Sequence, residues 1–268
     1  TYKRYYGEID KDECLLLMVL LKDMLTKRFQ ERNQENHNIK NWSDIQSTIH
    51  SQILAKTASL FVIYNNDIPI SMSICYHHGN VLFSYIDSYD IDYFKFGLGN
   101  ILIYKKLEQC FEYNYTFLDM GWGDLDYKRQ WCNHITNLGH YVFYPKNSLI
   151  ANCTALWEGN KTRLKAFLLS NKMNSFIEKS RKMFNPNNSY EKRTPNYRFE
   201  ILENFKSQSN LTAINLKNEE NFRFQSIIND FIYNTEEYYL DVKLYDFQNE
   251  GYYVLQGKKN QMKLVIEP

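Results

Sequence analysis

The chain has 268 residues, of which 44% are hydrophobic and 24% charged, and its formal net charge is +1. A near-neutral chain is not attracted as a whole to nucleic acid or to an anionic membrane, so DNA is not an expected partner. The length allows one large domain, or one ordinary domain with a smaller one.

Cysteine spacing and apolar runs exclude further classes. The five cysteines are far apart and no pair has CxxC spacing, so we expect no metal site and no disulfide framework. The longest purely apolar run, Leu15 to Leu21, is too short to span a bilayer, and no signal peptide is visible. We therefore expect a cytoplasmic protein with reduced thiols. The sequence begins at Thr1 rather than Met, which leaves an upstream segment open.

The first part of the chain predicts two helices and a strand meander. Residues 11–32 have a helical pattern with Asp12 available as the N-cap, and residues 43–56 form a second helix capped by Ser43. Runs rich in β-branched and aromatic residues, separated by polar turns, then predict antiparallel strands at 59–64, 68–76 and 81–89.

The next stretch alternates helix and strand, with a helix at 101–113, a strand at 115–120, a short helix at 126–135 and a strand at 140–145. In the first of these helices the apolar positions at helical spacing are Ile101, Ile103, Leu107 and Phe111. This order predicts an α/β (α+β) fold with a mixed, mainly antiparallel central sheet flanked by helices.

The last part of the chain predicts a smaller domain. Residues 161–184 have the pattern of a basic amphipathic helix or helix pair, and the polar, turn-rich segment 185–196 is the best boundary. We therefore expect a first domain at 1–184, a linker at 185–196 and a small α+β appendage at 197–268. Its expected elements are strands at 197–203, 211–216, 238–247, 252–256 and 261–267, with a helix near 219–234.

The segment FKFGLGN, residues 94–100, places two glycines directly before a helix. Without side chains, Gly97 and Gly99 let the backbone approach a phosphate, and the helix N-terminus offers unpaired N–H groups. Positive charge could come from Lys95, Lys105 and Lys106. The alternative is that the glycines only turn the chain from strand to helix, because a single G-x-G is a weak signal.

The stretch FLDMGWGDLDYKRQW, residues 117–131, leaves a strand through Gly121 and Gly123. Glycines at a strand end suggest that the backbone parts from its neighbour and leaves room for a ligand. Either Asp124 or Asp126 can cap the helix that follows.

That helix begins with Tyr127 and Lys128. The Tyr127 phenol could reach a ligand beside the glycines and give or take a proton. Lys128 could hold a carboxylate or phosphate, or stabilise an oxyanion, unless it is an ordinary solvated lysine. Trp131 lies one turn further on the same face, where core packing is the simpler role.

From about residue 40 to 146, the order of elements, the G-L-G before a helix and the D-M-G-W-G-D…Y-K-R-Q-W passage resemble the GNAT acyltransferase superfamily, most closely its CelD-like and FemAB-like branch. The resemblance implies an acyl thioester, acetyl-CoA or another acyl-CoA, between the splayed strands VLFSYIDSY and YTFLDMGW. The family pattern has Arg or Gln three residues before the first glycine, where this chain has Phe94, with Lys95 one place along. The pyrophosphate would lie on the amides of Gly97, Leu98, Gly99 and Asn100.

The resemblance also implies catalytic roles. Tyr127 would protonate the leaving thiolate, with Lys128 facing the reacting carbonyl. Asp87 or Asp90 would serve as the base toward the acceptor amine. The other expected site residues are Asp119 and Gly121 on the donor side, and Trp122, Asp124 and His134 on the acceptor side.

Three functions compete at this point. The first is an N-acyltransferase, in particular an N-acetyltransferase, acting on a small-molecule amine such as an amino sugar or amino acid in envelope or polysaccharide metabolism. The second is FemAB-like aminoacyl transfer from aminoacyl-tRNA, which the near-neutral charge disfavours. The third is a non-catalytic GNAT-shaped binding or scaffold module. The basic helix 161–184 has three interpretations: a solvated face, a membrane-surface helix, or the docking site of an acyl carrier protein if such a protein holds the donor. A homodimer stays open.

Overall fold

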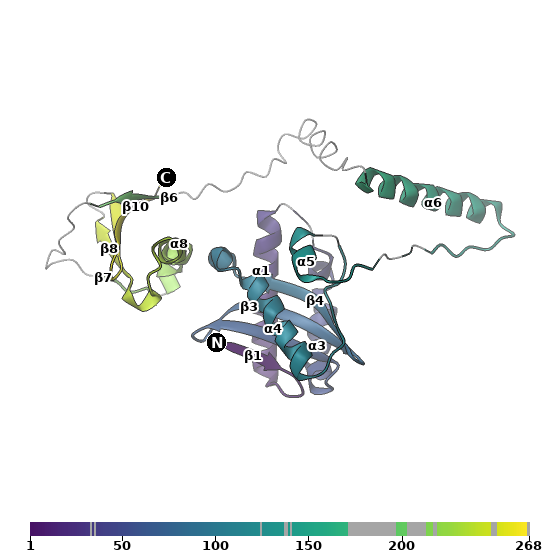
Figure 1. The fold of residues 1–268 in the computed structure, drawn as a ribbon, viewed down its shortest axis with the longest axis horizontal. Helices are drawn as coiled ribbons and strands as arrows, with labels where there is room; N and C mark the ends of the chain where they lie inside the picture. The colour runs from purple at the N-terminus through teal and green to yellow at the C-terminus, as the bar shows by residue number, and fades with distance from the viewer. Residues whose placement is uncertain are drawn as a thin grey trace. The chain divides into compact units, whose positions relative to one another are not determined.

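The computed structural model describes residues 1–32, 34, 36–123, 125–136, 139, 141–170, 197–202, 213–216, 219–247 and 251–266. Contacts divide the chain into two compact units, Thr1–Trp122 with Lys192–Pro268, and Gly123–Glu191. The first unit contains two five-stranded sheets (Figure 1). The expected linker at 185–196 lies outside the described residues.

The first sheet consists of β1 (Tyr2–Tyr5), β2 (Ala58–Asn65), β3 (Ile68–His78), β4 (Val81–Tyr89) and β5 (Phe117–Asp119), in that order. The first four strands pair antiparallel with their neighbours, and β5 runs parallel to β4. The predicted meander is confirmed in β2, β3 and β4. The sequence patterns did not predict β1.

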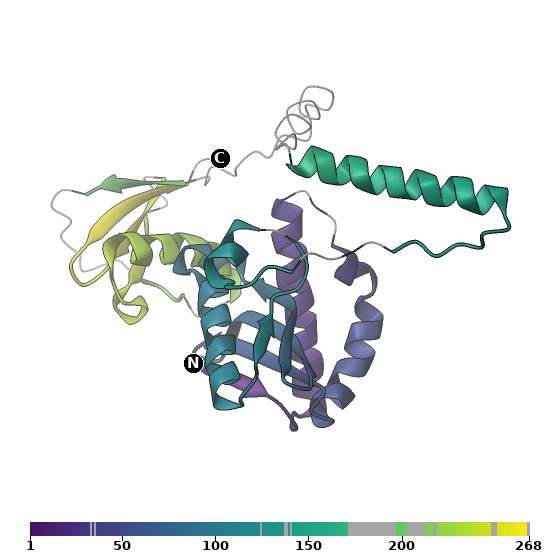
Figure 2. The ribbon, with the colours of Figure 1, turned by 45° about the vertical axis from the view of Figure 1, so that its right-hand side comes forward.

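Helices cover both faces of this sheet (Figure 2). On one face lie α1 (Lys11–Glu31) and α3 (Trp42–Leu54), which the short helix α2 (His37–Lys40) separates in the chain. On the other face lies α4 (Leu98–Glu112). The predicted fold class, a mixed, mainly antiparallel sheet flanked by helices, is confirmed.

Side chains along β2 alternate between the two hydrophobic cores, one on each face of the sheet. Leu60 and Val62 pack in the cluster with α1 and α3, whereas Phe61 packs in the cluster with α4. All three side chains are fully buried, and burial of such a side chain contributes about 1.5–3 kcal/mol. Both faces of β2 are therefore apolar, which explains why this inner strand has a continuous apolar sequence.

The helix starts differ from the expected caps. Asp10 rather than Asp12 caps α1, because its Oδ1 accepts hydrogen bonds from the N–H groups of Asp12 at 2.9 Å and Glu13 at 3.0 Å. Asp12 lies in the first turn, where the helix dipole favours an acid. Asn41 occupies the N-cap position of α3, so the expected cap Ser43 lies inside that helix.

α4 buries only part of the predicted face: Ile103 is 3% exposed and Leu107 is half-buried, as expected. Ile101 is 41% exposed and Phe111 is 89% exposed, so two of the expected core positions face solvent. The buried face instead includes Leu98, Leu102 and Lys106, of which the lysine is only 1% exposed. The pattern missed this part of the buried face because a lysine occupies a core position, and a buried charge needs a partner inside the protein.

The described part of the second unit contains α5 (Asp126–Trp131) and α6 (Leu149–Ser170). The strand predicted at 140–145 is wrong, because its described residues 141–145 form no strand and Phe143 is 93% exposed. An aromatic run becomes a strand only where neighbouring strands and a core support it. α6 begins before the helix predicted at 161–184, of which residues 171–184 lie outside the described residues.

The second sheet of the first unit has the order β6-β10-β9-β8-β7, with every pair antiparallel. Phe231 and Ile228 of the helix α8 pack in one core with Leu244, Leu255 and Leu264 of the strands. The predicted small α+β appendage is therefore present. Its elements are β6 (Tyr197–Ile201), β7 (Ala213–Ile214), the 3₁₀ turn η3 (Glu219–Phe224), α8 (Gln225–Thr235), the 3₁₀ turn η4 (Tyr239–Asp241), β8 (Lys243–Phe247), β9 (Tyr252–Gln256) and β10 (Gln261–Ile266).

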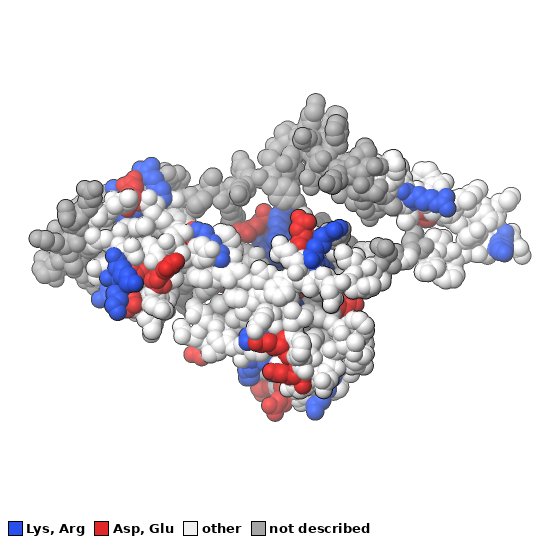
Figure 3. Space-filling model, in the orientation of Figure 1, with Lys and Arg blue, Asp and Glu red and all other residues white. Residues whose placement is uncertain are grey.

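Three general features bear on possible partners. On the face shown in Figure 3, lysines and arginines lie among acidic side chains rather than in one continuous basic field. All five cysteines carry free thiols. Within the residues that the structure describes, no helix is long and apolar enough to cross a membrane.

Candidate functional site

Strands β4 and β5 pair for three residues and then part. The register joins Val81 to Phe117 and ends where Phe83 faces Asp119. β4 continues to Tyr89, and no described strand pairs with it on this side beyond Phe83. We call residues Ser84–Tyr89 on this side the open edge of β4. From the family resemblance of the sequence, these two strands are the pair that we expect to splay apart.

A turn at the end of β5 leads the chain away from the sheet. The carboxylate of Asp119 accepts a hydrogen bond from the N–H of Gly121 at 2.8 Å. Gly121 has φ +68°, and a Cβ there would lie 3.4 Å from the Phe83 ring and 3.5 Å from the Ser84 carbonyl oxygen. Asp119 and Gly121 are therefore hydrogen-bonded to each other within this turn. Their roles in donor binding stay predictions. Trp122, which follows, is 84% exposed.

A β-bulge at Tyr85 brings two polar residues onto one face of β4. The register with β3 shifts between Ile74, which faces Ile86, and Cys75, which faces Ser84. Residues three apart in a regular strand point to opposite faces, but the extra residue puts Ser84 and Asp87 on the same face. Both side chains reach Lys106 of α4.

Lys106 and Asp87 form a buried ion pair with two serines. The Lys106 ammonium donates to the Asp87 Oδ1 at 2.8 Å, to the Ser84 hydroxyl at 2.7 Å and to the Ser73 hydroxyl at 3.5 Å. Ser73 donates to Oδ1 of Asp87, and Ser84 donates to Oδ2 at 2.9 Å. The Lys106 side chain is 1% exposed and that of Asp87 is 36% exposed. The pair therefore reaches the surface only at the carboxylate.

The surroundings of Asp87 keep it ionised. Burial raises its pKa, but the Lys106 ammonium and the hydrogen bonds from Lys106, Ser73 and Ser84 outweigh that effect, so the pKa of Asp87 lies below its ordinary value. A carboxyl with a lowered pKa is a weak proton acceptor and a good permanent negative charge. Its role as catalytic base stays a prediction, and the geometry favours an electrostatic role.

Arg28 of α1 lies at the open edge of β4. Its Nη1 donates to the backbone carbonyl of Asp87 at 3.2 Å, and its guanidinium lies 4.6 Å from the centre of the Tyr89 ring. One backbone acceptor of the open edge is therefore satisfied by a side chain instead of a strand. Sequence reasoning missed Arg28 because it stands among several charged residues at the end of a helix.

The glycine loop follows β4 directly. The 3₁₀ turn η1 (Ile91–Phe96) ends at Gly97, whose φ of +64° makes it both the C-cap of η1 and the N-cap of α4. The N–H groups of Leu98 and Gly99 lie in the first turn of α4, where no helix carbonyl precedes them. The N–H of Asn100 donates to the Gly97 carbonyl at 2.9 Å. No atom lies within 4 Å of a Cβ built at Gly97 or Gly99, so the loop is open to a ligand.

The lysines expected near a phosphate have partners within the chain. Lys95 pairs with Asp230 of α8 at 2.8 Å, and Lys105 pairs with Glu108 at 2.6 Å. Lys106 is buried with Asp87, so its expected place beside the glycine loop is wrong. The amides of the first turn, rather than lysine side chains, are the donors that this loop presents.

Two carboxyl groups at the end of β4 have pKa values above the ordinary value of an aspartate. Burial raises the pKa of Asp90, which caps η1 by accepting from the N–H of Asp92 at 3.1 Å. Burial and the charge of Asp90 raise the pKa of Asp92 to about 6. Asp90 was a predicted base, whereas Asp92 was missed. The signal that could have found Asp92 is the pair of acids two residues apart just after a strand.

The remaining predicted residues belong to the second unit. Tyr127, 40% exposed, and the half-buried Lys128 lie on α5, and His134 is exposed after it. Leu125 occupies the N-cap position of α5 without a side-chain cap, so Asp126 does not cap it. Asp124 lies outside the described residues. The roles of these residues stay predictions.

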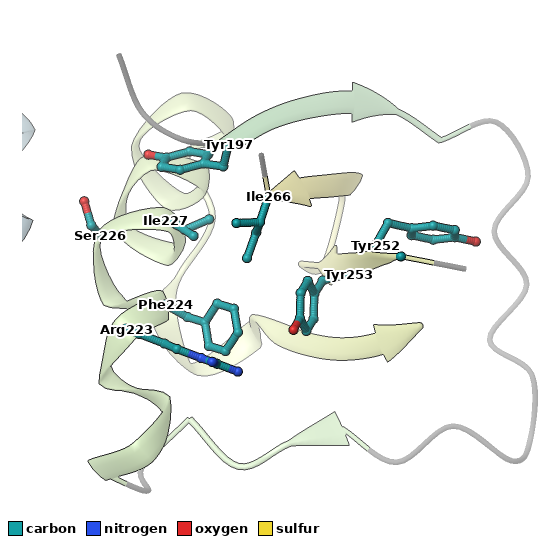
Figure 4. Close-up of a pocket in the computed structure, with 9 residues that line it drawn as sticks. Tyr197, Arg223, Phe224, Ser226, Ile227, Tyr252, Tyr253 and Ile266 are labelled. Atoms are coloured by element: carbon teal, nitrogen blue, oxygen red, sulfur yellow. The ribbon is translucent and has the colours of Figure 1, made fainter. Parts of the chain in front are cut away.

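A cavity of about 580 Å³ lies in the C-terminal part of the chain (Figure 4). Arg223, Phe224 and Tyr253 lie between the helix and the sheet in this view, with Ile227 and Ile266 beside them. None of the predicted site residues lines it. Among the described residues, no group of three or more His, Cys, Asp or Glu side chains could hold a metal ion.

Residues 12–129 match a protein-family model described as an acetyltransferase (GNAT) domain. This match runs from α1 to α5 and includes the open edge of β4 and the glycine loop. Over these residues the chain is similar to GNAT acetyltransferase domains. No curated protein matches the chain.

Several solved structures are similar to 53% of the chain. They include a GCN5-related N-acetyltransferase from Ralstonia eutropha JMP134, with 11% identity, 97% of its chain covered and a TM-score of 0.37. A predicted acetyltransferase from Clostridium acetobutylicum, solved with acetyl-CoA, has 9% identity, 95% coverage and a TM-score of 0.41. A possible acetyltransferase from Clostridium difficile 630 has 12% identity, 99% coverage and a TM-score of 0.38.

The ion pair predicts unequal effects of its two single substitutions. Asp87→Asn leaves a fully buried ammonium without a carboxylate, which costs about 3–5 kcal/mol of the free energy of unfolding. Lys106→Met leaves a partly exposed carboxylate that still accepts from two serines, so we expect a smaller loss. The double variant should be more stable than Asp87→Asn alone. Urea denaturation measures all three, and equal losses in the two single variants would contradict this asymmetry.

Proposed function

We propose that this chain, whose residues 12–129 match a GNAT acetyltransferase domain model, transfers an acyl group from an acyl-CoA thioester to the amine of a small molecule. One observation carries the proposal. β4 loses its parallel partner after Phe83, and the glycine loop with its open first-turn amides follows the same strand. A ligand that is an extended chain with amide groups and an anionic end fits the two features in turn: its amides pair with the open edge of β4, and its anionic end meets the first-turn amides of the glycine loop.

The donor would be held mainly by backbone groups. The N–H groups of Leu98 and Gly99 would bind the pyrophosphate, favoured by the dipole of α4. The open edge of β4 would pair with the amides of the pantetheine arm, as an added strand does. The bound acyl-CoA supplies the acyl carbon as an activated thioester. These residues bind and orient it, and Arg28 adds positive charge at the same edge.

The acceptor amine needs a proton acceptor, and Asp92 suits this task best. A base is most useful when its pKa lies near the working pH, and that of Asp92 is about 6. Asp87 would remain a fixed negative charge that attracts the amine as a cation. Tyr127 remains our proposed acid for the leaving thiolate.

The passage from Gly121 to Trp131 supports an acceptor of the CelD-like kind, an amino sugar or amino acid of envelope or polysaccharide metabolism. This finer assignment rests on the likeness of those residues alone. Transfer from aminoacyl-tRNA is less favoured, because the chain has a net charge of +1 and nucleic-acid binding needs many phosphate contacts.

Gly99→Leu tests the donor site. The leucine would fill the space before the first-turn amides, and losing one such bond to a charged oxygen costs roughly 1.5–3 kcal/mol, or about 10–100-fold in Kd. Calorimetric titration with CoA and with acetyl-CoA measures the change. Leucine favours a helix more than glycine, so the fold should not suffer.

Gly159→Leu on α6 is the matched control, because no atom lies within 4 Å of a Cβ at that position either. We expect its CoA affinity to equal that of the wild type. An unchanged Kd in Gly99→Leu would place the pyrophosphate elsewhere. No binding by the wild type would leave a donor on a carrier protein or tRNA, or a scaffold role.

If Asp92 is the base, the rate should fall at low pH. We expect kcat/KM to be constant above about pH 7 and to fall below about pH 6, because the protonated carboxyl cannot accept a proton. Asp92→Asn should lower the rate by roughly 10²–10⁴-fold. Thiol release with an amine found in a screen of primary amines measures both.

Asp90→Asn tests whether the charge of Asp90 is what raises the pKa of Asp92. Asparagine still caps η1 but carries no charge, so the pKa of Asp92 should fall and the acid limb of the rate profile should move to lower pH. A profile that does not move, or full activity in Asp92→Asn, would assign the base to another residue.

A further inference from the structure

The C-terminal helix α8 contacts the turn η1 that leads into the glycine loop. The contact joins residues more than a hundred positions apart in the chain, and it includes a hydrogen bond, an ion pair and a ring contact. The sequence disclosed no role for the segment 197–268, and this contact connects it to the candidate donor site.

The hydrogen bond is made by a buried, oriented amide. Asn229 is 4% exposed, and its Nδ2 donates to the backbone carbonyl of Asp92 at 2.9 Å. The Nε2 of Gln225, one turn earlier on α8, donates to the Asn229 Oδ1 at 3.0 Å. Both ends of the amide therefore have a partner, which fixes its direction toward η1.

The ion pair and the ring contact hold the end of η1. Lys95 lies 2.8 Å from the Asp230 Oδ2, with the two side chains 26% and 13% exposed. The same oxygen accepts from the Tyr197 hydroxyl at 2.5 Å. Phe96 meets Tyr233 of α8 edge to face, with ring centres 5.9 Å apart. These contacts flank Gly97 on its N-terminal side.

The turn η1 needs such support. It consists of two short 3₁₀ turns that meet at a kink at Tyr93, where φ/ψ are non-helical, and the hydrogen bonds of 3₁₀ turns are poorer than those of an α-helix. Its last residue determines how the chain enters Gly97, whose φ of +64° sets the direction of the first-turn amides of α4. Fixing η1 therefore fixes the donors that would meet a pyrophosphate.

We propose that α8 positions the glycine loop, so that Asn229 and Asp230 act as positioning residues for the phosphate end of the acyl donor. This inference rests on the proposed function. It assigns the C-terminal sheet and helix a task that acts through η1, without contact with the donor. The alternative is that Asp230 keeps Lys95 away from the phosphates and so weakens donor binding. The direction in which Asp230→Asn changes the affinity for CoA distinguishes the two.

The test uses the full chain with Asn229→Ala and Asp230→Asn. Asn234→Ala, an exposed position on the same helix, is the matched control, and Asp230→Glu is the conservative variant. Because a loosened loop must be ordered on binding, we expect Kd for CoA to rise about tenfold in the first two variants and to recover in Asp230→Glu. Binding of pantetheine, which lacks the pyrophosphate, should be equal in all of them.

Hydrogen exchange without ligand gives an independent readout. We expect faster exchange at the amides of residues 97–101 in Asn229→Ala and Asp230→Asn, with the C-terminal core around Leu244 and Leu255 unchanged. Tighter CoA binding in Asp230→Asn would overturn the proposal in favour of Lys95 being withheld. Unchanged CoA affinity with unchanged exchange would also overturn it. If the wild type binds no CoA, the proposed function fails, and exchange alone decides whether α8 holds the loop.

Discussion

The separation of β5 from β4 after three paired residues is the constraint on which the rest of this site depends. A strand edge inside a protein exposes N–H and carbonyl groups that need partners. Here Arg28 satisfies the carbonyl of Asp87 from outside the sheet. Gly121 and the Asp119 turn lead β5 away, so that the edge stays open to an added chain. The open edge ends at η1 and the glycine loop, which makes one continuous path of backbone donors and acceptors.

Beside this edge, charge is arranged in two different ways. Asp87 is held ionised by a buried lysine and two serines, whereas Asp90 and Asp92 are half-buried at the end of the same strand, and the charge of Asp90 adds to the raised pKa of Asp92. The first arrangement suits holding a cation and the second suits moving a proton. Acids with contrasting pKa shifts on neighbouring residues are a common mark of acid–base sites.

The sequence predicted the fold better than the site, for physical reasons. Periodicity reports burial, so α1, α3 and the meander were predictable, while β1 is short and residues 141–145 have the composition of a strand without forming one. Lys106 could not be placed in a core by any pattern, because a buried lysine depends on Asp87, which a bulge at Tyr85 turns toward it. Gly97 and Gly99 were found because glycine before a helix is a local signal. The partner of Lys95 lies on α8, and no local pattern reveals a contact across so many residues.

The measurement that tests the central claim most directly is an amide ¹H–¹⁵N NMR titration of the chain with acetyl-CoA. The account predicts that the largest shifts fall in two separate segments, residues 84–89 on the open edge of β4 and residues 97–100 in the glycine loop. Shifts confined to the C-terminal sheet around Arg223 and Tyr253, or to the glycine loop without the strand edge, would contradict it.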